Sequence, residues 1–91
     1  MIELGGNIKL DGFDNLEPAK LIVIKKLSGS HTKKITEKTK DFKEIIINLK
    51  SETPYKIELQ LFSEKNHTSI AEDKNLFYAF DKAFLQLTNK L

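Results

Sequence analysis

The sequence predicts an α+β domain in which four strands form one mixed sheet and two helices pack on one of its faces. Apolar residues at every second position indicate strands near the N-terminus and in the middle of the chain. Two segments with apolar residues at helical spacing follow the first and the last of these strands. The predicted order is therefore β-α-β-β-β-α, and packing both helices on one side is the economical way to bury their apolar stripes.

The length of the chain limits it to one domain. Ninety-one residues are enough for a single core, and we assign residues 1–91 to one domain. Hydrophobic residues make up 40% and charged residues 31%, a balance that is typical of a folded chain rather than a disordered one.

The first strand is predicted from two apolar pairs. Ile2 and Leu4, and then Ile8 and Leu10, alternate with polar residues on either side of a glycine pair. We interpret Gly5-Gly6 as a bulge within one strand. Asp14 or Asn15 is expected to cap the helix that follows, and Pro18 is tolerated in a first helical turn.

The first helix is predicted to run to about Thr39, with Leu21, Ile24, Leu27 and Ile35 at helical spacing. The segment KKLSGSHTKKI, residues 25–35, interrupts it with weak helix formers. On a wheel of 100° per residue, Ser28 and His31 share the side of Ile24, whereas Gly29 falls among outward lysines. A helical glycine costs about 1 kcal/mol relative to alanine. We therefore predict a continuous helix rather than a break.

Three further strands and a second helix complete the prediction. Isoleucine-rich residues 43–50 (KEIIINLK) and alternating residues 55–62 indicate two strands, and residues 67–72 indicate a shorter, more polar one. Short turns make these strands an antiparallel meander, whereas the helical connection permits the first two strands to pair in parallel. Asp73 is expected to cap the final helix. Its apolar stripe consists of Leu76, Phe77, Phe80, Phe84, Leu87 and Leu91.

Composition argues against an enzyme. The chain has no cysteine, which removes thiolate nucleophiles, thiolate metal sites and disulfides. Its two histidines, His31 and His67, stand in no metal-binding spacing, and Gly5-Gly6 lacks the pattern of a nucleotide-binding loop. We expect no catalytic residue, no metal and no cofactor. The acidic N-terminal segment has no signal-peptide character and no apolar run is long enough to span a membrane, so we expect a cytoplasmic protein without membrane contact.

Positive charge is concentrated in one segment. Residues 20–40 hold seven lysines and one acid, a net charge of +6, whereas residues 1–19 have a net charge of −3 and residues 41–91 of −1. All fifteen basic residues are lysines. Lysine is a point charge that suits phosphate, whereas bidentate recognition of guanine requires arginine. The segment therefore predicts contact with the backbone of a nucleic acid.

The helical wheel selects the candidate residues. Lys26, Lys33 and Lys40 follow one another at i, i+7 and i+14 near the outward pole, and Gly29 lies between them, where it would permit close approach of a phosphate backbone. The predicted RNA contacts of this segment are Lys25, Lys26, Gly29, Lys33, Lys34 and Lys40. Two alternatives stay open. One is a solvated lysine-rich face, and the other is a KH-type GxxG loop, although Thr32 occupies the position of the second glycine.

The C-terminal segment resembles the ribosome hibernation-promoting and ribosome-associated inhibitor family, the sigma-54 modulation type. In DKNLFYAFDKAFLQLTNKL, Asn75 to Asp81 follow the family's helix pattern Asp-Met-Tyr-Ala-Ala-Ile-Asp, with Asn75 at the first Asp, Leu76 at Met and Asp81 at the closing Asp. NHTSIAED is similar to the family's last strand and FKEIIINLK to its second. The element order is also similar.

The resemblance implies a fold related to double-stranded-RNA-binding domains and a non-catalytic regulator of translation. Members bind the small ribosomal subunit in its messenger and transfer RNA channel through basic residues on the helices. Gln86 and Asn89 stand where the family's last helix is basic, which leaves Lys82 and Lys90 as the contacts expected there. The first helix would then carry most of the contact with structured RNA.

A protein-interaction module is the alternative function. Ile46 and Phe62 fall on the sheet face opposite the inward-pointing residues of their strands. An uncovered apolar patch there would indicate a partner surface, and we expect a homodimer in that case.

Overall fold

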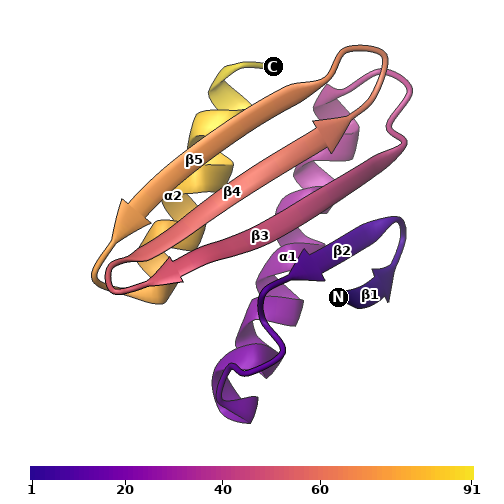
Figure 1. Ribbon diagram of the computed structural model, residues 1–91. Coiled ribbons are helices and arrows are strands. Elements are labelled where there is room, and N and C mark those ends of the chain that lie inside the picture. Colours follow the sequence, from indigo (N-terminus) through magenta and orange to yellow (C-terminus); the bar gives the residue numbers. More distant parts are fainter.

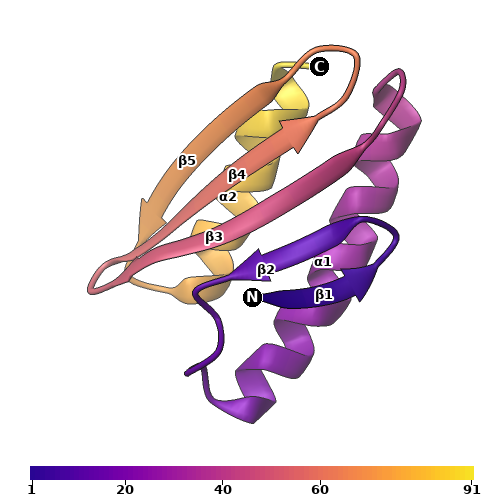
Figure 2. The ribbon, with the colours of Figure 1, turned by 45° about the vertical axis from the view of Figure 1, so that its right-hand side comes forward.

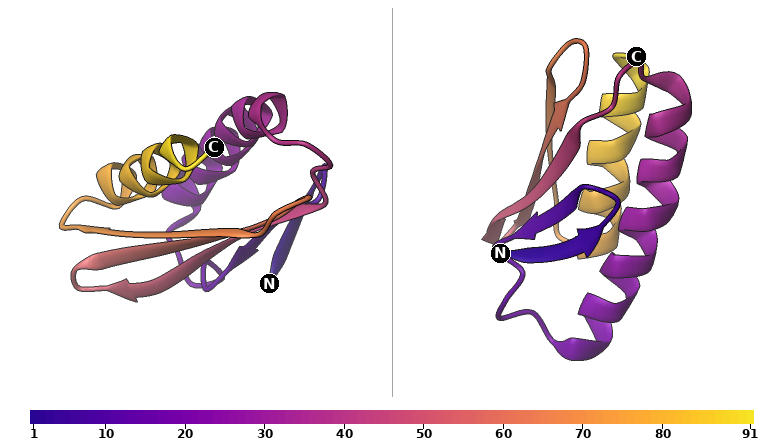
Figure 3. Two further views of the ribbon diagram at one scale, coloured as in Figure 1. Left: turned by 90° about the horizontal axis from the view of Figure 1, so that it is seen from above. Right: turned by 90° about the vertical axis from the view of Figure 1, so that its right-hand side faces the viewer.

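The computed structural model describes residues 1–91 as two layers, a five-stranded sheet and a pair of helices on one of its faces (Figures 1 and 3). The elements are β1 (Ile2–Gly5), β2 (Ile8–Asp11), α1 (Pro18–Lys38), β3 (Glu44–Glu52), β4 (Tyr55–Phe62), β5 (His67–Asp73) and α2 (Leu76–Asn89). The strands pair in the order β1-β2-β3-β4-β5, and only β2 and β3 run parallel. The predicted α+β class, mixed sheet and helix placement are confirmed.

The predicted first strand is wrong, because it is a hairpin of two strands (Figure 2). Gly5, Gly6 and Asn7 have φ values of 83°, 58° and 63°. Three successive residues in the left-handed region reverse the chain, and glycine and asparagine are the residues that adopt it readily. The pairing also shifts register between Glu3 and Gly5, so the predicted irregularity lies inside a hairpin and not within one strand. Ile2 consequently pairs with Leu10. The observed order is β-β-α-β-β-β-α, with five strands.

Helix α1 is continuous through the Ser-Gly-Ser-His segment, as predicted. The Ser28 hydroxyl is fully buried and donates to the carbonyl of Ile24 at 2.7 Å, which satisfies it inside the helix. Gly29 is exposed, so the missing side chain leaves no gap in the core.

Both predicted helix caps are wrong. Helix α1 begins at Pro18 after Glu17, which makes no side-chain cap, so neither Asp14 nor Asn15 has this role. Helix α2 is capped by Asn75, whose side chain accepts from the amides of Phe77 and Tyr78. Asp73, two residues before this cap, instead accepts a hydrogen bond from the backbone amide of Asn75 at 2.9 Å.

The core lies between the sheet and the helices. Ile45, Ile47, Ile57, Leu59 and Leu61 point inward from β3 and β4 and meet the buried residues of α2. Of the stripe predicted for α2, Leu76, Phe80, Phe84 and Leu87 are buried, Phe77 is half-buried, and Leu91 lies beyond the helix and is exposed.

The β2–α1 connection adds Phe13 and Leu16 to the core. Gly12 precedes them with a φ of 85°, and a Cβ there would lie 2.6 Å from the carbonyl oxygen of Leu49. Glycine is therefore required at this position for both its conformation and its size. Neither helix combines the length with the apolar character needed to cross a bilayer.

Candidate nucleic-acid interface

The outward side of α1 carries lysines that no acid neutralises. Lys25, Lys26, Lys33 and Lys34 are exposed and form no ion pair. Glu37 is the only acid within the helix. We call these four lysines the α1 face. Their charges project into solvent without a partner, so the helix presents an electropositive surface.

Gly29 lies within the α1 face. A Cβ built on it would meet no atom within 4 Å, so the space above this part of the helix is open. The turn between Lys26 and Lys33 therefore exposes backbone where a longer residue would stand between the lysines and a ligand.

Lys40 does not belong to the α1 face, which corrects the predicted row of three lysines. The helix ends at Lys38, and Thr39 has extended backbone angles, φ −104° and ψ 148°. The Thr39 amide and hydroxyl both donate to the carbonyl of Ile35, at 2.9 and 2.6 Å, and so close the last turn. The chain leaves the helix axis before Lys40, and the i+14 relation no longer applies.

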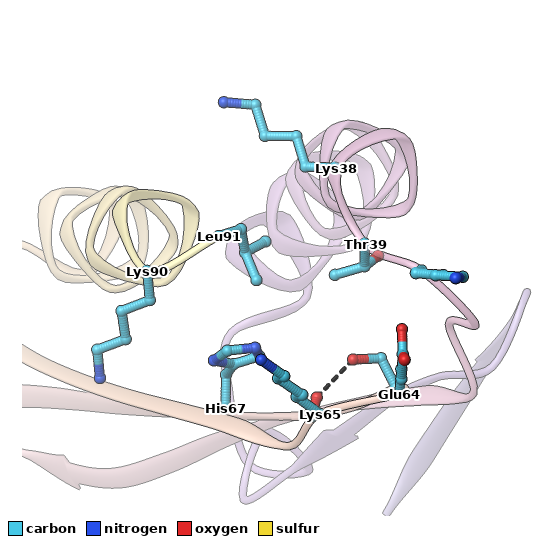
Figure 4. Close-up of a pocket in the computed structure, with 9 residues that line it drawn as sticks. Lys38, Thr39, Glu64, Lys65, His67, Lys90 and Leu91 are labelled. Atoms are coloured by element: carbon cyan, nitrogen blue, oxygen red, sulfur yellow. Dashed lines mark hydrogen bonds between the residues drawn. The ribbon is translucent and has the colours of Figure 1, made fainter.

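Lys40 instead joins Lys90 at one end of the molecule. A cavity of about 210 Å³ lies there, beyond the C-terminal ends of both helices (Figure 4). We call its lysines Lys38, Lys40, Lys65 and Lys90 the end cluster. The ammonium of Lys90 donates to the carbonyl of Thr68 on β5. Lys38 and Lys65 were not predicted as site residues, since no local pattern connects the β4–β5 turn with the end of α1.

Lys82 is already engaged. Its ammonium lies 2.6 Å from a carboxylate oxygen of Asp73. The hydrogen bond from Lys82, followed by that from the backbone amide of Asn75, lowers the pKa of Asp73 below its usual value. Among the lysines predicted to contact RNA, this one alone has an acidic partner.

The two helices are joined by His31. Its ring stacks on Phe84 with centroids 4.7 Å apart and planes 13° from parallel. Its Nε2 atom lies 3.0 Å from an Asp81 carboxylate oxygen, across the groove between α1 and α2. Lys34 lines the same groove. These contacts fix the position of the α1 face relative to α2.

The uncovered face of the sheet differs from the α1 face. Its lysines are paired, in Lys9–Glu44 at 2.8 Å, Lys50–Glu58 at 3.6 Å and Lys56–Glu72 at 3.3 Å. The hydrogen bond to Glu44 raises the pKa of Lys9. Ile46 and Phe62 are half-buried on this face, where they were predicted, and Ile70, which pairs with Glu58 farther along the sheet, is 47% exposed. The predicted homodimer through this face stays a prediction.

No three histidine, aspartate or glutamate side chains gather where they could hold a metal ion.

Comparisons with known proteins show the fold. No family model and no curated protein matches the chain. Among solved structures, the chain is similar to a ribosomal subunit interface protein from Coxiella burnetii, with a TM-score of 0.61 and 13% identity over 92% of this chain and 91% of that chain. At this identity the similarity concerns the fold alone. The resemblance to the hibernation-promoting family is thus supported at the level of the fold.

Proposed function

We propose that the protein binds RNA of the small ribosomal subunit and catalyses no reaction. The observation that carries the proposal is the α1 face, four exposed lysines without acidic partners. The fold similarity to a ribosomal subunit interface protein supports the choice of the ribosome.

The contact would be made with phosphates. Lys26 and Lys33 are two helical turns apart, about 10 Å along the axis. Each ammonium can neutralise a phosphate and release its condensed counterion, which makes binding depend strongly on salt. Exposed backbone at Gly29 lets the sugar-phosphate strand approach between them. Lys25 and Lys34 flank this line and contribute to the field.

The protein would regulate translation by occupying space on the small ribosomal subunit. A domain measuring 34 × 23 × 17 Å, bound to rRNA at the subunit interface, excludes other ligands from the volume that it fills. We propose this steric exclusion as the mechanism, because it requires no chemistry from the protein.

Sedimentation with separated ribosomal subunits tests the proposal. The protein is expected to move with the small subunit at low salt and to dissociate at high salt. Replacing Lys26 and Lys33 with glutamine should weaken binding. The matched control replaces Lys50 and Lys56 with glutamine, which removes the same charge from lysines that are already paired. A protein that stays free of both subunits at low salt would refute the proposal.

Homodimerisation through the sheet ranks second. Ile70, which is exposed on the same face of the sheet as Ile46 and Phe62, favours it. Three ion pairs lie among these residues, however, and an interface would have to desolvate them. Gel filtration at several concentrations measures it, and elution as a 10.4 kDa monomer at every concentration would remove this alternative.

A further inference from the structure

The end cluster is built from three separate parts of the chain that hydrogen bonds hold together. The amide of Glu64, in the β4–β5 turn, donates to the carbonyl of Lys40 at 3.1 Å, which ties that turn to the α1–β3 connection. The Ser63 hydroxyl donates to the carbonyl of Lys65 at 2.5 Å and closes the turn (Figure 4). The backbones that carry Lys40 and Lys65 are therefore positioned before any ligand arrives.

The charge of this cavity is strongly positive and unpaired. None of the four lysines of the end cluster forms an ion pair. Glu64 is the only carboxylate side chain among the lining residues. Figure 4 shows Lys90 reaching toward the sheet beside His67, whereas Lys38 points away from the cavity and stands at its rim. The lysines that line the cavity give it a positive potential, which would attract an anion.

The volume of the cavity limits the size of the anion that it can hold. Pockets for drug-sized ligands measure about 300–1,000 Å³, and this one measures about 210 Å³. It therefore suits a single tetrahedral oxyanion better than a whole nucleotide. Only one of its nine lining residues is hydrophobic, and His67 is the only aromatic ring among them, so its lining favours a phosphate over a base.

The α1 face leads to this cavity. Lys34 and Lys38 are one turn apart on the same side of α1, and Lys33 precedes the end of the helix by about 8 Å of rise. We propose that the end cluster is a phosphate subsite, which takes one phosphodiester of the same RNA strand that crosses the α1 face. The inference rests on the proposed RNA-binding function and adds a second point of contact, at a different part of the protein.

Helix dipoles provide the competing explanation. Lysines near the C-terminal ends of helices stabilise them by offsetting the partial negative charge there. If this were their whole role, replacing them would lower stability and leave ligand binding unchanged. The two explanations therefore predict different measurements.

Titration with inorganic phosphate, followed by amide NMR shifts, tests the subsite directly. Shifts are expected at Thr39, Lys40, Glu64 and Lys65, and the same ionic strength of chloride should not reproduce them. Lys40→Gln/Lys65→Gln should abolish these shifts, whereas Lys50→Gln/Lys74→Gln, at the opposite end of the sheet, should preserve them. Equal shifts with chloride would overturn the proposal.

Measurements of RNA affinity are the second test of the phosphate subsite. With a short RNA hairpin, Lys40→Gln/Lys65→Gln should reduce the slope of log affinity against log salt by about one unit, since one phosphate contact is lost. Glu64→Gln removes the opposing carboxylate and should raise affinity roughly fivefold, the equivalent of about 1 kcal/mol. This gain cannot arise from misfolding. A Glu64→Gln affinity equal to wild type, together with an unchanged slope in the double variant, would overturn the subsite.

The outcomes separate this inference from the proposed function. Specific phosphate shifts in a protein that binds neither RNA nor ribosomal subunits would assign the subsite to free phosphate and refute the RNA contact. RNA binding that depends on Lys26 and Lys33, but not on Lys40 and Lys65, would retain the function and refute the subsite.

Discussion

The two helices lie side by side on one face of the sheet, yet they contribute differently to the molecule (Figure 3). Helix α2 buries six of its fourteen residues, including Phe80 and Phe84, whereas α1 buries four of its twenty-one. Two of the four in α1 are the small polar residues Ser28 and Thr32. The comparison indicates that α2 supplies stability and that α1 supplies charge.

Thr32 is a buried residue of α1 that lowers the stability of the fold. Its hydroxyl is buried and has no hydrogen-bond partner, an arrangement that opposes folding by about 1–3 kcal/mol. Helix α1 thus depends on its neighbours, through His31 on Phe84 and through Ile24 and Ile35 in the core.

The largest expected effect concerns α2. Phe80→Ala removes a fully buried ring, and we expect it to lower the free energy of unfolding by about 3–5 kcal/mol. Small domains have only about 5–15 kcal/mol in total, so the variant should be close to unfolding. Urea denaturation measures the change, with Leu85→Ala, an exposed position on the same helix, as control. A loss as small as that of the control would contradict the role of α2.

The next effect concerns the α1 face. Lys26→Glu/Lys33→Glu should lower RNA affinity on the order of a hundredfold at low salt, because two attractive contacts become repulsive. The free energy of unfolding should change by less than about 0.5 kcal/mol, since both side chains are exposed. Filter binding and urea denaturation measure the two quantities. Loss of binding together with unfolding would show that α1 also carries stability.

Gly29→Ala tests whether the exposed backbone of α1 contributes to RNA binding or only lowers stability. Because an added methyl group meets no atom within 4 Å, alanine should raise the free energy of unfolding by about 1 kcal/mol through its helix propensity. We expect RNA affinity to fall, because the methyl group stands where the phosphate backbone approaches. Thermal unfolding and RNA titration on one preparation check both. Unchanged affinity would mean that Gly29 faces only water in the complex.

The smallest effect concerns Lys82, the paired lysine of α2. Lys82→Gln should raise the pKa of Asp73 toward its usual value and leave RNA affinity nearly unchanged. The pKa of Asp73 is depressed in the folded protein, so the pair stabilises above the unfolded pKa, and this contribution is lost as pH falls through the folded pKa. The stabilities of wild type and variant should therefore converge in acid. Carboxyl NMR titration follows Asp73, and an unmoved pKa would argue that Lys82 is not its partner in solution.

The predictions that rest on the periodicity of apolar residues within α1, β3 and β4 succeeded. Continuous α1 followed from the placement of Ser28 and Gly29 on a wheel, and the inward residues of β3 and β4 followed from period-two alternation. The cap of α2 was misassigned because aspartate and asparagine are both competent N-caps and both precede that helix, whereas α1 has no side-chain cap at all. The lysines of the α1 face were predicted because they lie on one helix. The end cluster was not predicted as a cluster, because its lysines come from separate parts of the chain.

Periodicity and composition are local properties, and they were enough to predict the α+β class, the continuity of α1 and the concentration of lysine on it. The turn from Gly5 to Asn7 was also within reach of the sequence, because glycine and asparagine between two alternating runs favour a hairpin. The placement of Lys40 with Lys65 and Lys90 at one cavity, and the pairing of Lys82 with Asp73, came from the folded structure. Each of these depends on backbone angles or on contacts between segments far apart in the chain. Such contacts leave no pattern in the order of residues, since the packing of the sheet and the ends of the helices bring them together.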